Sequence, residues 1–227
     1  ARFEAMRQCF KGNQRVYIHA NEIQQLVDII DFSKAFDLPF PVIVGGYDSY
    51  LVGQRLVDAE IPIMLLRPHS LPLSEDDPID LPFQLPSLLQ RQGIKYCIQN
   101  EGDKEAMNAR NLAFMAGTAM AYGLTEEEAI SSISLNTAQI LGIDDKYGSI
   151  EVGKTATLFA SKGSAIDMKT NNVTLIMING NLSSTDNFQN ELYMKSTFIL
   201  PTGFFINGDF TCERSVHTEF MAEFFTF

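Results

Sequence analysis

Four short apolar runs, each followed by a helix-like segment, constrain the fold of this chain more than any other feature. The runs are VYIH (16–19), PVIVGG (41–46), IPIMLL (61–66) and IKYCIQ (94–99). Near-continuous apolarity is typical of strands buried on both faces, and strands that alternate with helices pair in parallel through right-handed crossovers. The sequence therefore predicts an α/β fold in which these runs are neighbouring parallel strands.

The segments between and after these runs have helical patterns. Residues 21–36 and 48–59 carry apolar positions at three- and four-residue spacing, as helices covering one face of a sheet do. Further along, Thr125 and Glu128 form a capping-box pattern at the start of another helix. Asn136 is expected to cap a short helix that closes at Gly142.

The sequence pattern changes at Tyr147, where short β-rich runs separated by Gly and Asn turns begin. We therefore expect a small β module with a C-terminal helix over 147–195, after a strand–helix part over 1–146. Residues 196–227 contain eight of the 17 phenylalanines without a sustained period. A tail this apolar must dock, pair with another chain, or be an unnatural terminus, because it would otherwise aggregate.

Composition excludes several classes of function. The formal net charge of -11 repels phosphate backbones, so nucleic acid is not an expected partner. No apolar run is long enough to cross a bilayer, and residues 1–14 are too polar for a signal peptide. The chain begins without Met inside a helix-like segment, which suggests a piece of a longer protein. Its compartment is therefore left open between the cytoplasm and export by an upstream signal.

A specific motif lies at Asn136–Phe159, NTAQILGIDDKYGSIEVGKTATLF. It resembles the C-terminal signature of the amidohydrolase superfamily, close to the imidazolonepropionase-like branch. That signature runs from an Asn-Pro-Ala or Asn-Thr-Ala helix start through Leu-Gly to Gly-Ser-Leu-Glu-x-Gly-Lys-x-Ala-Asp-Leu. The resemblance covers about residues 1–195 and excludes the phenylalanine-rich tail.

The resemblance implies a (β/α)8 TIM barrel beside a small β-sandwich, with the four predicted strands as the last four of the barrel. Such a half barrel leaves one flank of the sheet open, which with the phenylalanine-rich tail is a candidate surface for homo-oligomers. The first half of the barrel, with its usual His-x-His pair, would lie upstream. We expect no measurable hydrolase activity from these 227 residues alone.

The resemblance also implies a metal site at the C-terminal ends of the strands. The family draws a Lys or His from the fifth strand, a His from the sixth and an Asp from the eighth. His19 fits the first place, and Gly45 and Gly46 stand where the second ligand would be. Asn100 or Glu101 replaces the Asp, and Glu101 could act as a metal ligand or general base. Zinc is the expected cofactor, with iron, manganese or no metal as alternatives.

Each candidate also has a purely structural interpretation. His19 would be a strand-end imidazole bonded to a neighbour, and Gly45–Gly46 a tight turn in place of a backbone approach to ligand. The remaining candidates are substrate contacts with structural alternatives: His69 as a loop anchor, and Arg110 and Asn111 as partners of Glu101 or Asp103. Glu75, Asp76, Asp77 and Asp80 are a solvated face of a loop or ligands of a hard cation.

The sequence therefore predicts a fragment of an amidohydrolase that cleaves a non-peptide C–N bond in an amide or cyclic imide-type small molecule through metal-activated water. The missing sixth-strand His favours an alternative, a degenerate domain of the same fold that binds small molecules or serves assembly. A free-standing doubly wound binding domain is a third possibility. The GSIEVGK stretch argues against it, because such a sheet has no use for that motif.

Overall fold

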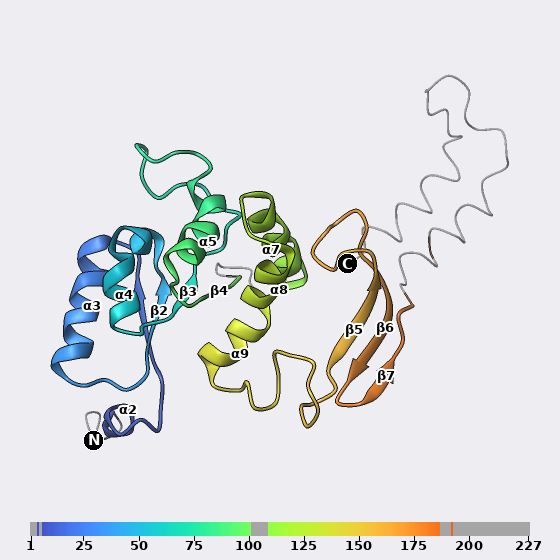
Figure 1. The fold of residues 1–227 in the computed structure, drawn as a ribbon, viewed down its shortest axis with the longest axis horizontal. Helices are drawn as coiled ribbons and strands as arrows, with labels where there is room; N and C mark the ends of the chain where they lie inside the picture. The colour runs from blue at the N-terminus through green and yellow to red at the C-terminus, as the bar shows by residue number, and fades with distance from the viewer. Residues whose placement is uncertain (1–3, 5, 101–108, 187–191, 193–227) are drawn as a thin grey trace, which may run out of the picture. The chain divides into compact units, whose positions relative to one another are not determined.

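The computed structural model describes residues 4, 6–100, 109–186 and 192 (Figure 1). The chain divides into two compact units, Ala1–Ser183 and Ser184–Phe227. The elements below all lie in the first unit, and the predicted boundaries at 146 and 195 remain predictions. The predicted phenylalanine-rich tail, Glu101 and Asp103 lie outside the described residues, as does the predicted C-terminal helix apart from residue 192.

The first unit contains the predicted parallel sheet, because all four apolar runs form strands. They are β1 (Val16–Ala20), β2 (Pro41–Gly45), β3 (Ile63–Leu65) and β4 (Tyr96–Ile98). The strands lie in the order β1-β2-β3-β4, and each pairs in parallel with the next. The predicted α/β class and parallel pairing are confirmed, and the strand order matches the order along the chain.

Helices follow the strands as the crossover rule requires (Figure 1). The helical elements are α2 (Arg7–Phe10), α3 (Ile23–Ala35), η1 (Tyr47–Val52), α4 (Gly53–Asp58), α5 (Leu81–Gln92), η2 (Ala109–Asn111), α7 (Leu112–Ala121), α8 (Glu126–Ile133) and α9 (Leu135–Leu141). The predicted capping box is present at α8, where Thr125 Oγ1 accepts from the Glu128 backbone N–H. None of the helices in the described part of the chain combines the length and apolarity that a bilayer crossing requires.

The predicted cap of α9 is wrong. The helix begins one residue before Asn136, at Leu135, and the Asn136 amide instead donates to the Tyr96 carbonyl oxygen at 3.1 Å. This bond fastens α9 to β4, so a tertiary contact has replaced the local cap. The helix does end at Gly142, whose φ of 70° is the left-handed conformation that glycine favours.

The two faces of the sheet bury different residues. Successive strand partners Ile18, Ile43, Ile63 and Tyr96 face the main core, which also contains side chains of α3, α5 and α7. The alternate row consists of His19, Val44, Met64 and Cys97, again in register. In this second face Val42, Met64 and Cys97 pack with Ile140 of α9. The helices α3, α5 and α7 therefore pack on one face, and His19 belongs to the other.

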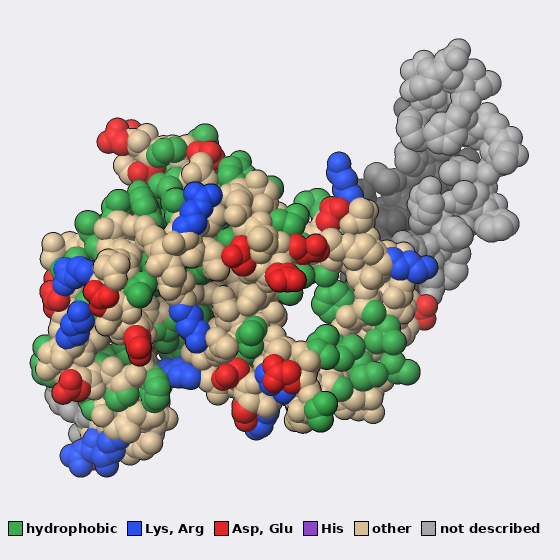
Figure 2. All heavy atoms as spheres, viewed as in Figure 1, with side chains coloured by type: hydrophobic (Ala, Val, Ile, Leu, Met, Phe, Trp, Pro, Cys, Tyr) green, Lys and Arg blue, Asp and Glu red, His purple; other side chains and the backbone are tan. Residues whose placement is uncertain are grey.

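A smaller antiparallel sheet follows in the same unit, formed by β5 (Leu158–Lys162), β6 (Asn172–Ile178) and β7 (Asn181–Ser183). Ile166, from the β5–β6 connection, is buried in the main core. Hydrophobic side chains are exposed on and before this sheet, among them Val152, Phe159, Ile178 and Leu182 (Figure 2). The described residues form one three-stranded sheet with exposed apolar side chains, and the predicted β-sandwich remains a prediction.

Candidate functional site

His19 lies one residue before the end of β1, with its side chain exposed on the sheet face opposite to α3, α5 and α7. It is the one titratable imidazole in a row whose other members are Val44, Met64 and the buried thiol of Cys97. Among the described residues it has no hydrogen-bond or ion-pair partner. No described residue hydrogen-bonds to the His19 imidazole as its structural interpretation requires. The ring nitrogens are accessible to a ligand.

Gly45 ends β2 and Gly46 follows it at the start of η1, both in positive-φ conformations, at 106° and 68°. A Cβ on Gly45 would lie 2.4 Å from Asn21 Oδ1, and a Cβ on Gly46 would lie 2.7 Å from Ile63 Cγ2. The backbone is also hydrogen-bonded to β1, since the Gly46 N–H donates to the Ala20 carbonyl at 2.7 Å. Glycine is therefore needed for a close-packed turn, and a histidine side chain has no room at either position.

The third predicted ligand position follows β4. Asn100 is half-buried, while Glu101 lies outside the described residues. The preceding residue, Gln99, uses its amide to donate to the Met64 carbonyl at 3.0 Å and so fastens the end of β4 to β3. Because β1 and β4 are the two edges of the sheet, three strand spacings of about 4.8 Å separate them along its width.

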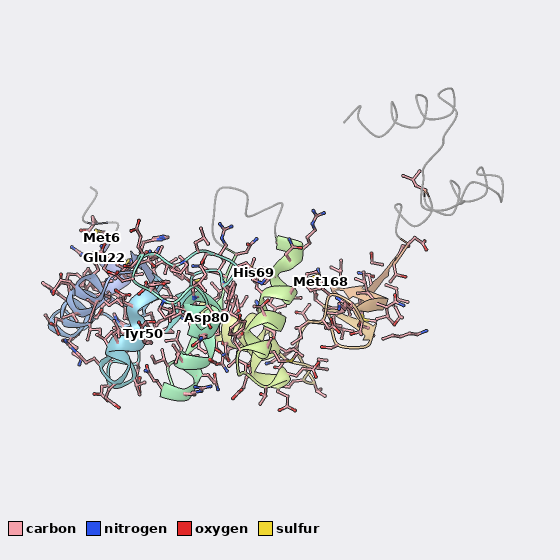
Figure 3. All side chains as sticks on the ribbon, turned by 90° about the horizontal axis from the view of Figure 1, so that it is seen from above. Met6, Glu22, Tyr50, His69, Asp80 and Met168 are labelled. Carbon is pink, nitrogen blue, oxygen red and sulfur yellow. The ribbon has the colours of Figure 1, made fainter. Side chains whose placement is uncertain are left out.

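His69 lies in the β3–α5 loop and contacts α7. Its Nε2 lies 2.6 Å from Thr118 Oγ1 on α7, which packs against the face of the sheet opposite to His19 (Figure 3). The Thr118 hydroxyl has one hydrogen, and the Phe114 carbonyl lies 3.1 Å away to accept it. His69 Nε2–H then donates to Thr118. Burial, and secondly the nearby Arg67 guanidinium, hold the pKa of His69 below its ordinary value, which favours the neutral ring.

Arg110 and Asn111 lie in η2, immediately before α7. Arg110 is exposed, and its predicted partners Glu101 and Asp103 fall outside the described residues. Asn111 is half-buried at the N-cap position of α7 without a side-chain cap bond. Their proposed contact with a substrate carboxylate remains a prediction.

The acidic loop between β3 and α5 is fastened to η1 by a bond that the sequence did not suggest. The buried Tyr47 hydroxyl donates to Asp77 Oδ2 at 2.9 Å. Burial, and then this hydrogen bond, raise the pKa of Tyr47 to about 12. Asp77 therefore has a structural partner, and the described part of the chain holds no cluster of three metal-ligating side chains.

The described residues do not fit a complete catalytic metal shell. His19 is one candidate nitrogen ligand, the sixth-strand place has no room for a second, and the eighth-strand carboxylate is outside the described range. A catalytic zinc site usually needs three protein ligands. Any full shell must therefore use side chains beyond those described.

Comparison with known proteins identifies the fold. The sequence model of the amidohydrolase family matches residues 84–183. A solved amidohydrolase from Thermotoga maritima aligns over 80% of this chain and 46% of its own, with a TM-score of 0.66 and 24% identity. A solved adenosine deaminase from Xanthomonas campestris with bound zinc aligns over 86% of this chain and 52% of its own, with a TM-score of 0.54 and 17% identity.

Curated relatives match a shorter stretch. Imidazolonepropionase of Pseudomonas fluorescens is 36% identical over 75 residues, which are 32% of this chain and 18% of that protein. Imidazolonepropionase of Pseudomonas aeruginosa is 38% identical over 82 residues, 34% of this chain and 20% of that protein. The matches thus span about a fifth of these relatives. The predicted resemblance to amidohydrolases of the imidazolonepropionase-like branch is confirmed, and the four parallel strand–helix units are a fragment of a TIM barrel.

Proposed function

We propose that this chain is the C-terminal half of an amidohydrolase-type enzyme that hydrolyses a non-peptide C–N bond in an amide or cyclic imide-type small molecule, with zinc, iron or manganese as cofactor. The single observation that supports it most is His19. It is an accessible imidazole near the carboxyl end of a parallel barrel strand, where TIM-barrel enzymes carry their chemistry. The imidazolonepropionase relatives support the C–N bond class.

In this proposal His19 contributes one ring nitrogen to the metal, and the residues that follow it in the same row of the sheet are apolar or a buried thiol. Val44 is its partner on β2 and Met64 is the partner of Val44 on β3, and neither competes for a cation. Glu101 supplies a further ligand or the general base, with Asn100 next to it in the chain. The other ligands come from the remaining barrel strands, which we propose belong to a longer protein.

The open edges of the sheet support that part of the proposal. Among the described strands, β1 and β4 each pair on one side only. An unpaired parallel edge is a template for further strands, since its backbone N–H and C=O groups need partners. We propose that these edges join the remaining barrel strands, and that a homo-oligomer forms through the same edges where those strands are missing.

A non-catalytic domain of the same fold is the second candidate, and the geometry of β2 favours it. The close-packed Gly45–Gly46 turn leaves no room for the sixth-strand ligand, so at least one usual member of the shell is absent. A site with fewer ligands binds a metal more weakly, although it can still bind a small molecule.

Hydrolysis assays on the full-length protein distinguish the two. Succinimide and hydantoin serve as cyclic probes, and acetanilide as a linear amide, with products followed by proton NMR. The proposal predicts ring-opened or cleaved product that disappears with chelation and in His19→Ala, but persists within a few-fold in Tyr17→Ala. Tyr17 is the matched control, because it is also exposed two residues earlier on β1. A folded protein without activity on any probe, or with activity indifferent to His19→Ala, contradicts the proposal.

A further inference from the structure

An open depression of about 640 Å³ lies between the β3–α5 loop, the first turn of α5 and the end of α7. Its lining includes Arg67, His69, Phe83, Thr118 and Tyr122. The helix α7 packs on the face of the sheet opposite to His19. None of the residues that line the depression is a proposed metal ligand, and its volume is in the range of small-molecule sites.

Arg67 makes this depression cationic. Its side chain is half-buried, and no carboxylate among the described residues lies within ion-pairing distance of it. Arg91 and Arg110 also have no ion-pair partner among the described residues, so Arg67 is distinguished by its place in the lining of the depression. A guanidinium presents planar, forked N–H donors that match a carboxylate in a two-point contact.

Part of the lining is aromatic. The rings of Phe83 and Tyr122 lie 5.4 Å apart between centroids, with 33° between their planes. His69 meets Phe83 edge-on, with 6.2 Å between ring centroids and 73° between planes. Tyr122 is 37% exposed, so the aromatic surface is open to solvent. Such rings favour stacked or edge-on contact with another planar ring.

The His69 ring is held in a fixed orientation. Its Nε2 bonds to Thr118 Oγ1 at 2.6 Å, and Thr118 is itself fastened to the Phe114 carbonyl. The ring thus bridges the β3–α5 loop to α7, and the depression keeps its shape without a ligand. Preformed sites bind with less ordering cost than sites that must assemble.

We propose that this depression is a binding site for a small planar aromatic carboxylate, with the carboxylate on Arg67 and the ring on Phe83 and Tyr122. Inorganic phosphate could pair with Arg67 but has no ring for the aromatic side chains. A saturated carboxylate could pair with Arg67 and contact the rings, but it has no planar face to stack on them. The shape and chemistry of the wall favour the planar ligand over both. This site is independent of the proposed hydrolytic activity.

Titration of the full chain with benzoate tests the proposal, with dissociation constants from ligand-observed NMR. Benzoate is expected to bind at least about tenfold more tightly than cyclohexanecarboxylate, benzamide or inorganic phosphate, since a lost charge-assisted contact or ring stack costs about a factor of ten. Arg67→Gln is expected to weaken benzoate about tenfold or more, with Arg67→Lys intermediate. Lys34→Gln removes the same charge from an exposed position in the last turn of α3 and is expected to leave binding unchanged.

Three results overturn the proposal. They are no benzoate binding, equal binding of phosphate or cyclohexanecarboxylate, and equal loss in Arg67→Gln and Lys34→Gln. Phe83→Leu supplies a second arm if Arg67→Gln fails to fold by circular dichroism. It keeps an apolar side chain and removes the ring, so it is expected to erase the preference for benzoate over cyclohexanecarboxylate. An unchanged preference would also contradict the proposal.

Discussion

Replacing Gly46 by alanine tests whether close packing at the end of β2 is what excludes a metal-binding side chain there. The added Cβ would lie 2.7 Å from Ile63 Cγ2, well inside ordinary contact. Ile63 is fully buried in the main core, and its β-branched side chain has little rotamer freedom with which to move away. The substitution therefore adds a steric clash to a backbone position that already disfavours alanine.

The chain offers a closely matched control in Gly93. Its φ of 73° is near the 68° of Gly46, but a Cβ on Gly93 would meet no atom within 4 Å. Both substitutions force an L-residue into the left-handed region at about 1–2 kcal/mol, which a less flexible unfolded chain offsets by about 0.4–1 kcal/mol. Only Gly46→Ala adds overpacking, which costs about 1–3 kcal/mol.

The expected loss of unfolding free energy is therefore about 1 kcal/mol for Gly93→Ala and about 2–4 kcal/mol for Gly46→Ala. The chain contains no tryptophan, so urea unfolding is best followed by far-ultraviolet circular dichroism. The difference between the two variants isolates the clash with Ile63. Equal destabilisation by the two substitutions refutes the reasoning, because it means that the turn has room for a side chain.

The remaining predictions concern bonds seen in the structure. Tyr47→Phe removes the bond to Asp77 and is expected to cost about 1.5–3 kcal/mol at neutral pH, measured by urea unfolding. The raised pKa of Tyr47 favours the neutral phenol in the folded state, so its contribution is complete below pH 10 and lost as pH rises from 10.0 towards about 12. Between pH 10 and about 12, Tyr47→Phe should lose less unfolding free energy than wild type. Equal losses in the two proteins would contradict this. Thr125→Ala removes the capping box of α8 and is expected to cost about 1 kcal/mol, whereas no change in the unfolding midpoint would show that the cap contributes nothing. Because the pKa of His69 is lowered in the folded state, the stability that the neutral ring contributes is present above pH 6.5 and is lost as pH falls below it. His69→Gln should therefore show a smaller fall in thermal midpoint on acidification than wild type, measured over a pH series. An equal fall in the two proteins would refute this.

The sequence alone predicts the sheet well, for a physical reason. Strands buried on both faces must be apolar along their whole length, so runs such as 41–46 stand out from their helical neighbours. Position within the run places His19 at the end of the first strand, and the structure extends that strand by one residue, to Ala20. Local start and stop signals also identify Gly142 as the end of α9 and Thr125 as the cap of α8.

Contacts between distant segments are what the sequence does not reveal. His69 meets Thr118 across 49 positions, and Tyr47 meets Asp77 across 30, so both bonds depend on how helices and loops pack. Asn136 shows the same limit, since its local capping signal is overridden by the Tyr96 carbonyl. Arg67 and the aromatic pair of Phe83 and Tyr122 carry no motif, and only their placement around one depression singles them out.

The metal content of the full-length protein tests the proposed role of His19 most directly. After purification from metal-replete medium, mass spectrometry of the dissolved metals is expected to find about one equivalent of zinc, iron or manganese per chain. His19→Ala should lose that metal, while Tyr17→Ala, altered on the same exposed face of β1, should keep it. A metal-free wild-type protein, or an equivalent retained by His19→Ala, would contradict the account.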